Sequence, residues 1–427
     1  MQKFINTVRS IAAHKELRKK ILFTGMIVFV YRFFAHVPVP AVNVSQITQL
    51  FSSSQFLSLL NVFSGGTLAN SSIVAVGISP YITASIVMQL ATMAFPALKE
   101  IQKDGEAGKE KVNQYTRLLS LPLAIVQSIS VLALLNSQSL IESQDPLSLI
   151  AMISSLVAGS LILMWLGELI SLYGIGNGIS MVLLIGILSQ APRAFLQISS
   201  ITTQQQFLTM LIFASVLLLV ISLVVFMNEA IRKIPIQYAK RVRGSRVYGG
   251  QSTHLPIRVN VAGVLPIIFG VSIMLLPSFL ARLFIASGQA RLLDIGQRLS
   301  IWFAQTSPIY MITYFLIVVV FTFFSALIFF NAEDISGELK KSGAFVPGTR
   351  PGGPTKTFLE FVVTRITLAG AFFLGGIAIL PSVAQNITGI QSLAIGGTSV
   401  LIIVSVILET SKQIQGMLVG QNYERFS

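Results

Sequence analysis

Long apolar runs alternate with short polar segments along this chain of 427 residues. A helix needs about 20 apolar residues to cross a bilayer, because it rises about 1.5 Å per residue. Ten runs come close to that length, near residues 21–38, 72–95, 118–137, 147–168, 177–192, 207–228, 260–281, 308–330, 362–381 and 396–411. Barrel strands would instead alternate within short segments. The pattern therefore predicts an all-α integral membrane protein with ten transmembrane helices.

The composition supports this class. Hydrophobic residues make up 53% of the chain and charged residues only 11%, with a mean hydropathy of +0.77. A soluble globular protein has about 25% charged residues. There is no cysteine, which excludes disulfides and thiolate metal sites.

The basic residues are distributed unevenly, and their distribution orients the spans. Of the 30 Lys and Arg residues, 25 lie in segments on the same side as the N-terminus. Four lie on the opposite side, and Arg32 is near the outer end of the first span, where its side chain can snorkel. The positive-inside rule then places both termini in the cytoplasm, as an even number of spans requires.

Ionisable side chains are almost absent from the spans. Glu168, Glu229 and Glu409 lie at predicted cytoplasmic ends, and no carboxylate or histidine is near mid-membrane. A charge at the centre of the bilayer costs about 2.5–3.5 kcal/mol and usually marks an ion or proton path. A secondary transporter, the main alternative, would need a polar site at that depth. The chain also has no HExxH or GxSxG motif, so we predict no enzyme, catalytic residue, metal or cofactor.

The stretch "GIGNGIS" at 174–180 resembles a phosphate-binding loop only superficially, because no strand precedes it. We interpret it as a tight turn in which Gly174, Gly176 and Gly178 allow positive φ and close helix approach. Asn177 is then expected to cap the fifth span.

The outer segment "FLSLLNVFSGG" at 56–66 has eleven apolar or small residues, too few to cross the membrane. Its residues leave two possibilities open. It lies on the membrane surface as an interfacial helix, or it folds back into the bundle and lines a cavity.

Two cytoplasmic loops, 229–259 and 331–361, are long and basic. In the first, Arg241, Arg243 and Arg246 alternate with apolar residues around a glycine pair, which predicts a projecting hairpin. In the second, Arg350 precedes Pro351-Gly352 and would stand on another tip. Such loops fix topology or touch anionic lipid, and their tips would also suit RNA phosphates or an acidic protein surface.

The second span has an unusual stripe. In "GISPYITASIVMQL" at 77–90, Ile78, Ile82 and Ile86 are four residues apart and line one helix face beside small hydroxyls. A span that faced only lipid would need no such stripe.

Several long stretches, in this order, carry a family resemblance: "SGGTLANSSIVAVGISPYITASIVMQL", "EAGKEKVNQYTRLLS", "GIGNGIS", "YAKRVRGSRVYGGQSTHLPIRVNVAGVLPIIF", "LKKSGAFVPGTRPGGPT" and "GGTSVLIIVSVILET". From about residue 18 to 425, the chain resembles the SecY family, the central subunits of the bacterial protein-conducting channel. The resemblance implies two pseudo-symmetric five-helix halves, 1–192 and 193–427, around an hourglass pore. It also implies passage of unfolded secretory polypeptides across the plasma membrane and sideways release of apolar segments into lipid.

The resemblance further assigns roles to individual residues. The implied pore ring consists of Ile78, Ile82, Ile179, Leu183, Ile268 and Ile402. The implied lateral gate includes Thr83, Gln127 and Leu276. The implied plug, near 56–70, includes Phe56, Leu57, Leu59, Leu60, Val62 and Phe63.

The resemblance also implies partners. The ribosome and the SecA motor would dock on the cytoplasmic loops, with Arg117, Arg243, Arg246 and Arg350 as contacts. Small SecE-like and SecG-like membrane subunits would accompany the chain, and signal-bearing polypeptides would be its substrates. The chain itself would bind no cofactor.

Overall fold

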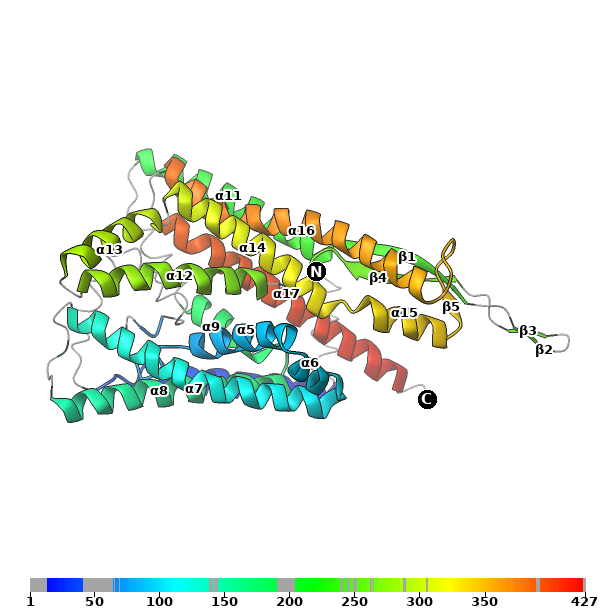
Figure 1. Ribbon diagram of the computed structural model, residues 1–427, viewed down its shortest axis with the longest axis horizontal. Helices are drawn as coiled ribbons and strands as arrows, with labels where there is room; N and C mark the ends of the chain where they lie inside the picture. The colour runs from blue at the N-terminus through cyan, green and yellow to red at the C-terminus, as the bar shows by residue number, and fades with distance from the viewer. Residues whose placement is uncertain are drawn as a thin grey trace. The chain divides into compact units, whose positions relative to one another are not determined.

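The computed structural model is mainly helical (Figure 1). It describes residues 14–40, 64, 66–68, 70–137, 141, 145–189, 204–238, 241–243, 246–248, 252–261, 263, 265–286, 289–304, 306–388 and 392–424. Each of the ten predicted spans contains a helix. These helices are α2 (Lys15–Phe34), α5 (Ser79–Ala94), α7 (Gly105–Ser137), α8 (Pro146–Tyr173), α9 (Gly178–Leu188), α11 (Gln204–Glu229), α12 (Leu265–Ala286), α14 (Pro308–Phe329), α16 (Gly353–Thr388) and α17 (Ser392–Glu424).

Helix length and hydropathy agree with the membrane prediction. Five helices in the described part of the chain are long and apolar enough to cross a bilayer, or up to six if one bent pair is a single span. Shorter apolar helices cover Gly178–Leu188, Leu217–Glu229 and Leu265–Ser278. The all-α membrane class is confirmed.

The chain divides into two compact units. The first comprises Met1–Ile212, Phe279–Gln297 and Ile402–Ser427. Within it α5 packs against α7, α7 against α8, and α8 against both α2 and α9. The second comprises Phe213–Ser278 and Arg298–Leu401. The two halves that the sequence predicts, divided after residue 192, remain a prediction.

The second predicted span begins later and ends more sharply than its hydropathy suggests. Residues 73–78 form turns rather than helix, with Gly77 at φ 67°, and Pro80 lies in the first turn of α5. At the other end the chain bends by 106° into α6 (Pro96–Lys103). A residue before proline avoids the helical region, and Phe95 accordingly has φ −108° and ψ 114°.

A small sheet lies in the second unit. Its strand order is β4 (Ser252–Arg258), β1 (Ile231–Tyr238), β5 (Ala344–Phe345), all antiparallel. The strands lie beside α15 (Ala332–Lys341), as Figure 1 shows. Beyond the sheet, β2 (Arg241–Arg243) pairs with β3 (Arg246–Tyr248).

The second predicted loop, 331–361, contains helical segments. Asn331 caps α15, and residues 353–361 are the first turns of α16. Apolar side chains from β1, β4, α15 and α16, and one from the residue after β5, make a cluster that consists of Ile234, Ile257, Ala332, Val346, Leu359 and Val363. Because these side chains come from both loops, the two loops fold as one structure.

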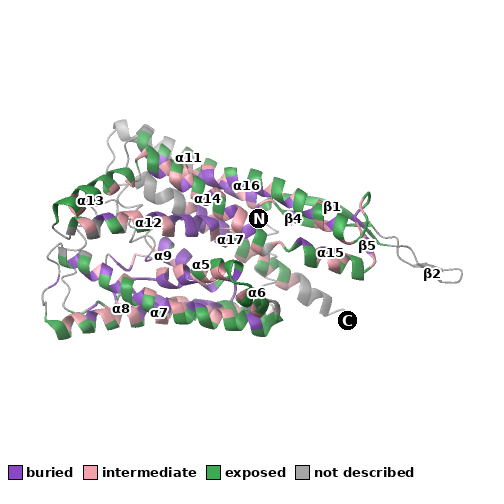
Figure 2. Ribbon diagram, viewed as in Figure 1, coloured by how far each residue is buried: buried purple, intermediate pink, exposed green. Residues whose placement is uncertain are grey.

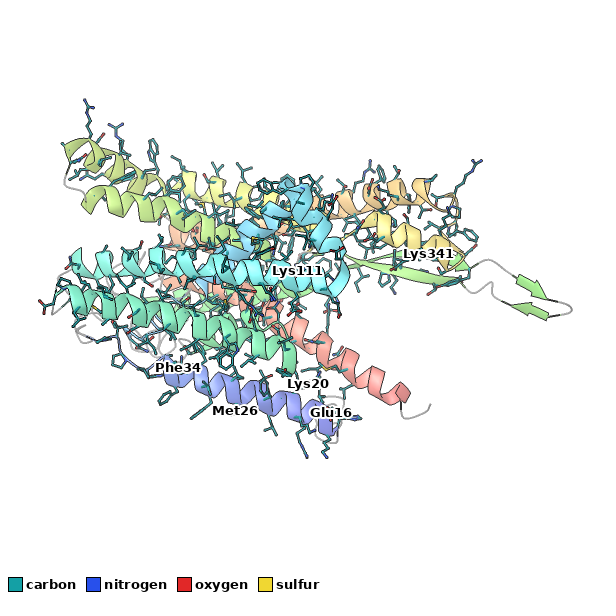
Figure 3. All side chains as sticks on the ribbon, turned by 60° about the horizontal axis from the view of Figure 1, so that its bottom comes forward. Glu16, Lys20, Met26, Phe34, Lys111 and Lys341 are labelled. Carbon is teal, nitrogen blue, oxygen red and sulfur yellow. The ribbon has the colours of Figure 1, made fainter. Side chains whose placement is uncertain are left out.

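Large apolar side chains are exposed along the helices. Leu118 on α7 is 74% exposed and Leu147 on α8 is 80% exposed. Figure 2 shows exposed residues along the free sides of these two helices. Figure 3 shows the side chains carried by α2, with Met26 and Phe34 labelled along it. Apolar outer faces of this kind are what a lipid-facing bundle requires.

Candidate functional site

The turn that leads into α5 is fixed by hydrogen bonds and by close packing. The Gly77 N–H donates to the Val74 carbonyl at 2.9 Å, and the Ser160 hydroxyl on α8 donates to the Gly77 carbonyl at 2.9 Å. At the preceding residue of α8, Gly159, a side chain would overlap the Ile73 carbonyl. The small residues of α8 therefore position Ile78, whose side chain is 2% exposed.

The turn that leads into α9 is held from three helices. The Thr24 hydroxyl on α2 accepts from the Ile175 N–H at 3.1 Å, and the Ser171 hydroxyl on α8 accepts from the Gly178 N–H at 2.9 Å. The Gln413 side-chain carbonyl on α17 accepts from the Gly176 N–H at 2.7 Å. All three partners accept from backbone N–H groups of the turn, so side chains of three helices hold its main chain.

The glycine predictions for this turn are partly confirmed. Gly176 has φ 85°, and a side chain at Gly178 would overlap the Gly167 carbonyl. Gly174, however, has φ −97°, so its predicted positive φ is wrong. Position 174 requires glycine for another reason: a Cβ there would lie 2.6 Å from the Thr24 hydroxyl oxygen.

The predicted cap is confirmed, since the Asn177 Oδ1 accepts from the N–H groups of Ile179 and Ser180 at 3.1 and 3.3 Å. We expect Asn177→Ala to lower the free energy of unfolding by about 1 kcal/mol, because two helix donors lose their acceptor. Thermal unfolding of the purified protein would measure this change. Asn177→Ser keeps an acceptor and should lose much less, and an equal loss in both variants would contradict the capping role.

Two of the predicted ring residues meet at one point of α8. A Cβ at Gly167 would lie 3.6 Å from Ile78 Cδ1 and 3.6 Å from the backbone nitrogen of Ile179. Gly167 thus brings the starts of α5 and α9 together. One turn further along their helices, Ile82 and Leu183 are 7% and 4% exposed. Ile78, Ile82 and Leu183 are thus buried within the first unit, whereas Ile179 is half-buried.

The other two predicted ring residues are also buried. Ile402 on α17 and Ile268 on α12 are each 2% exposed. Ile402 belongs to the first unit and Ile268 to the second. The closure of all six into one ring remains a prediction.

The predicted gate residues lie on helices that pack in pairs. Thr83 on α5 and Gln127 on α7 are half-buried, and these two helices pack together. Leu276, which precedes Pro277 in α12, is 56% exposed. In the same unit α12 contacts α14, where Tyr314 and Val318 approach Gly270 closely. The plug residues 56–63 lie outside the described residues.

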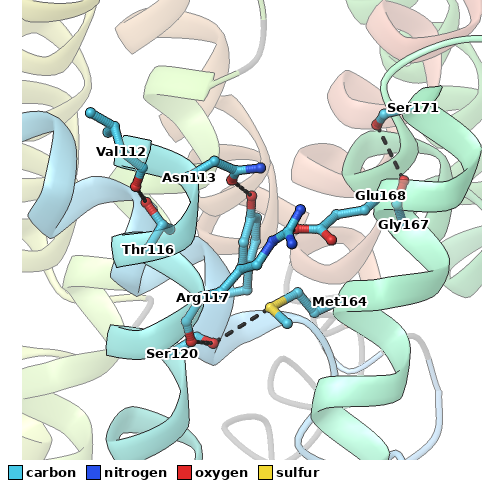
Figure 4. Close-up of polar contacts among 10 residues, drawn as sticks. Val112, Asn113, Thr116, Arg117, Ser120, Met164, Gly167, Glu168 and Ser171 are labelled. Atoms are coloured by element: carbon cyan, nitrogen blue, oxygen red, sulfur yellow. Dashed lines mark hydrogen bonds and ion pairs between the residues drawn. The ribbon is translucent and has the colours of Figure 1, made fainter. Parts of the chain in front are cut away.

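A polar network that the sequence analysis missed connects α5, α7 and α8 (Figure 4). The Arg117 Nε donates to the Glu168 carboxylate at 2.7 Å, and the Glu168 side chain is only 13% exposed. One turn before Arg117, Asn113 Oδ1 accepts from the Tyr81 hydroxyl at 3.1 Å. Hence Arg117, which we predicted as a partner contact, already has a partner within the chain, and Glu168 is less open to water than its position suggested.

The predicted hairpin is present. Arg243 pairs with Arg246 in the antiparallel register of β2 and β3, so the chain reverses between them rather than at the later glycine pair. Arg350 is exposed between two positive-φ glycines, Gly348 at 85° and Gly352 at 102°. The Thr355 hydroxyl donates to the Arg350 carbonyl at 2.8 Å and fixes this tip. Among the described residues, no group of three or more His, Cys, Asp or Glu side chains could hold a metal.

The chain is similar to known proteins over nearly its whole length. The SecY family profile matches residues 72–411. A "Protein translocase subunit SecY" from Streptomyces galbus is 43% identical, covering 96% of this chain and 97% of the relative. Two solved structures share the fold at 19% identity, each covering 93% of this chain and 92% of its own. One is described as "The plug domain of the SecY protein stablizes the closed state of the translocation channel and maintains a membrane seal", with a TM-score of 0.64. The other is "Sec61 in the Canine ribosome-channel complex from the endoplasmic reticulum", with a TM-score of 0.56. This chain therefore belongs to the SecY family.

Proposed function

We propose that this protein is the channel subunit of a protein translocase, which passes unfolded secretory polypeptides across the membrane and releases apolar segments sideways into lipid. One observation carries the proposal: the starts of α5 and α9, which carry Ile78 and Ile179, both approach Gly167 on α8, and Ile78 there is buried. They sit on turns held by backbone hydrogen bonds, as a fixed constriction requires.

An apolar constriction suits this function for two physical reasons. It excludes ions by dewetting when it is narrow. It also offers a passing polypeptide no hydrogen-bond partner that would retain it. A polar transporter site would retain the polypeptide by hydrogen bonds, so the buried apolar side chains of Ile78, Ile82 and Leu183 support the channel over the transporter.

Lateral release requires a gate between helices that opens toward lipid. We place this lateral gate at the helices that carry Thr83, Gln127 and Leu276. Leu, Ile, Phe and Val each favour insertion by about 0.3–0.6 kcal/mol, so only a long apolar segment would leave through such a gate. In this proposal the 56–63 segment plugs the resting channel, as the description of the SecY structural neighbour says of that protein.

The proposed location is the bacterial plasma membrane, with both termini in the cytoplasm. The uneven distribution of basic residues supports this orientation. The ribosome or a SecA motor would dock on the β-sheet structure that unites the two basic loops. The canine neighbour is described in a ribosome–channel complex, which supports the ribosome as a partner. SecE-like and SecG-like subunits complete the proposed assembly.

Site-specific photo-crosslinking tests the channel. A photo-reactive residue is placed at Ile82 or Ile268 in the assembled complex, and a stalled nascent chain with a signal sequence is offered. We expect crosslinks to the nascent chain at both positions, and none when the signal is removed. Absence of crosslinks from both positions would reject the channel in favour of a small-solute transporter.

Charge reversal tests the docking surface. We expect the double variant Arg246→Glu and Arg350→Glu to weaken binding of ribosomes or SecA at least tenfold, because both tips would lose contacts to phosphate or carboxylate groups. Co-sedimentation with membranes over a salt series would measure the loss. Arg291→Glu, an exposed residue predicted on the opposite side, is the matched control. An equal effect of the control would contradict a specific docking site.

A further inference from the structure

A groove runs along the free side of α2 toward its C-terminal end. It has a volume of about 340 Å³ and is lined by Phe29, Arg32, Phe33, His36 and Val37. Residues 29, 32, 33 and 36 follow the spacing i, i+3, i+4, i+7, so they lie on one face of the helix. Phe29 and Phe33 are 73% and 64% exposed, and this face is therefore free of protein contacts among the described residues.

The described part of the chain offers Arg32 no anionic partner. Among the described residues, no carboxylate lies within ion-pair distance of its guanidinium. Arg32 lies near the predicted outer end of the first span. A guanidinium there is suited to bind phosphate, because its planar N–H donors match the phosphate oxygens.

His36 supplies a hydrogen-bond acceptor to the groove. One of its ring nitrogens, Nδ1, lies 2.8 Å from the Arg32 carbonyl oxygen. A carbonyl oxygen only accepts hydrogen bonds, so Nδ1 carries the proton. In a neutral ring the other nitrogen, Nε2, is then an acceptor. His36 is exposed, and this nitrogen is free to receive a hydrogen bond from a ligand.

Along the chain the groove is lined by Phe29, Arg32, Phe33, His36 and Val37, so one cation and one acceptor stand among apolar side chains. A glycerophospholipid offers a group for each: an acyl chain for the apolar side chains, a phosphate for the cation and a headgroup for the acceptor. We propose that this groove binds one glycerophospholipid whose headgroup carries a hydrogen-bond donor, such as ethanolamine or glycerol. The phosphate would bind Arg32, the headgroup donor would bind His36 Nε2, and an acyl chain would lie against Phe29.

Choline, which has no N–H or O–H group, provides the discriminating probe. The full-length protein is reconstituted in nanodiscs of phosphatidylcholine, phosphatidylethanolamine or phosphatidylglycerol, all at the same pH and salt concentration. Native mass spectrometry then counts the lipids that remain bound. We expect the wild type to retain one additional ethanolamine or glycerol lipid, at least fivefold more often than a choline lipid.

Four variants separate the contributions. Arg32→Gln should lose the additional lipid of every type, while Arg32→Lys should retain it in part. His36→Phe should retain one lipid but no longer distinguish choline from the other two headgroups. Arg18→Gln removes a cation from the opposite end of the same helix and should change nothing. Size-exclusion profiles confirm that each variant is folded.

Two results would overturn the proposal. The first is equal lipid retention by the wild type and a folded Arg32→Gln variant. The second is loss of a co-purifying membrane protein, rather than a lipid, from that variant, which would assign the groove to an acidic side chain of a protein. Retention of glycerol but not ethanolamine lipids would reject the role of His36, because selection would then follow net charge.

Discussion

Gly178→Ala is expected to destabilise the protein by about 3 kcal/mol or more and to abolish translocation. A Cβ at this position would overlap the Gly167 carbonyl on the neighbouring helix. Overpacking a well-packed core usually costs about 1–3 kcal/mol, and here the obstacle is backbone rather than a flexible side chain. The start of α9 would have to move, and Ile179 and Leu183 would move with it. Thermal unfolding would measure the first effect and transport of a secretory protein into vesicles the second.

Gly353→Ala is the matched control for this variant. Gly353 is also the first residue of its helix, α16, but a Cβ there meets nothing within 4 Å. We expect it to change neither stability nor transport by more than the error of the measurement. If Gly178→Ala transported normally, the α8–α9 contact would not position the constriction, and the role we give to Gly167 would be wrong.

The sequence predicted the spans well because lipid exposure is a property of each helix by itself. An apolar run of sufficient length must be helical in lipid wherever it packs, since no water can satisfy its backbone groups. Asn177 and Gly176 were predictable for a similar reason, because capping and positive φ depend on local chemistry. The start of α5 was misplaced because hydropathy does not distinguish apolar turns from apolar helix.

Contacts between distant segments were not predictable in this way. The pairing of β5 with β1 joins the two basic loops, yet β5 has only two residues and no strand-like pattern. The hydrogen bond from Gly176 to Gln413 joins residues 237 positions apart. Both depend on tertiary packing, which a single sequence does not reveal. For the same reason Arg117 was predicted as a partner contact without its partner Glu168.

These contacts share a physical theme. The buried apolar residues near the constriction are positioned by small hydroxyl groups, namely those of Thr24, Ser160 and Ser171, which bind backbone rather than one another. A hydrogen bond to backbone fixes the main chain and leaves the apolar side chains free to meet. The main chain at this site is therefore held in place while its side chains remain apolar, and a channel for unfolded chains requires both.

Arg117→Glu is expected to lower the free energy of unfolding by about 2 kcal/mol. It places two carboxylates together where Glu168 is mostly buried. Breaking a fully buried pair costs about 3–5 kcal/mol, and we reduce that figure because Arg117 is 42% exposed. Glu168→Arg should cost a similar amount for the opposite reason. The double variant Arg117→Glu with Glu168→Arg should recover most of the stability, since it restores an ion pair of reversed polarity. Thermal unfolding of the four proteins forms the double-mutant cycle.

The same four proteins also distinguish two roles for Arg117. If it positions α7 against α8, beside the Tyr81–Asn113 hydrogen bond, transport should fall in both single variants and return in the double variant. If Arg117 instead contacts the ribosome or the motor, binding of that partner should be lost in Arg117→Glu and stay lost in the double variant. The 2.7 Å pair favours the positioning role, because a guanidinium already held by a shielded carboxylate would have to break that contact to reach a partner. If the double variant recovered its stability but not its partner binding, Arg117 would have to leave Glu168 and bind the partner during docking.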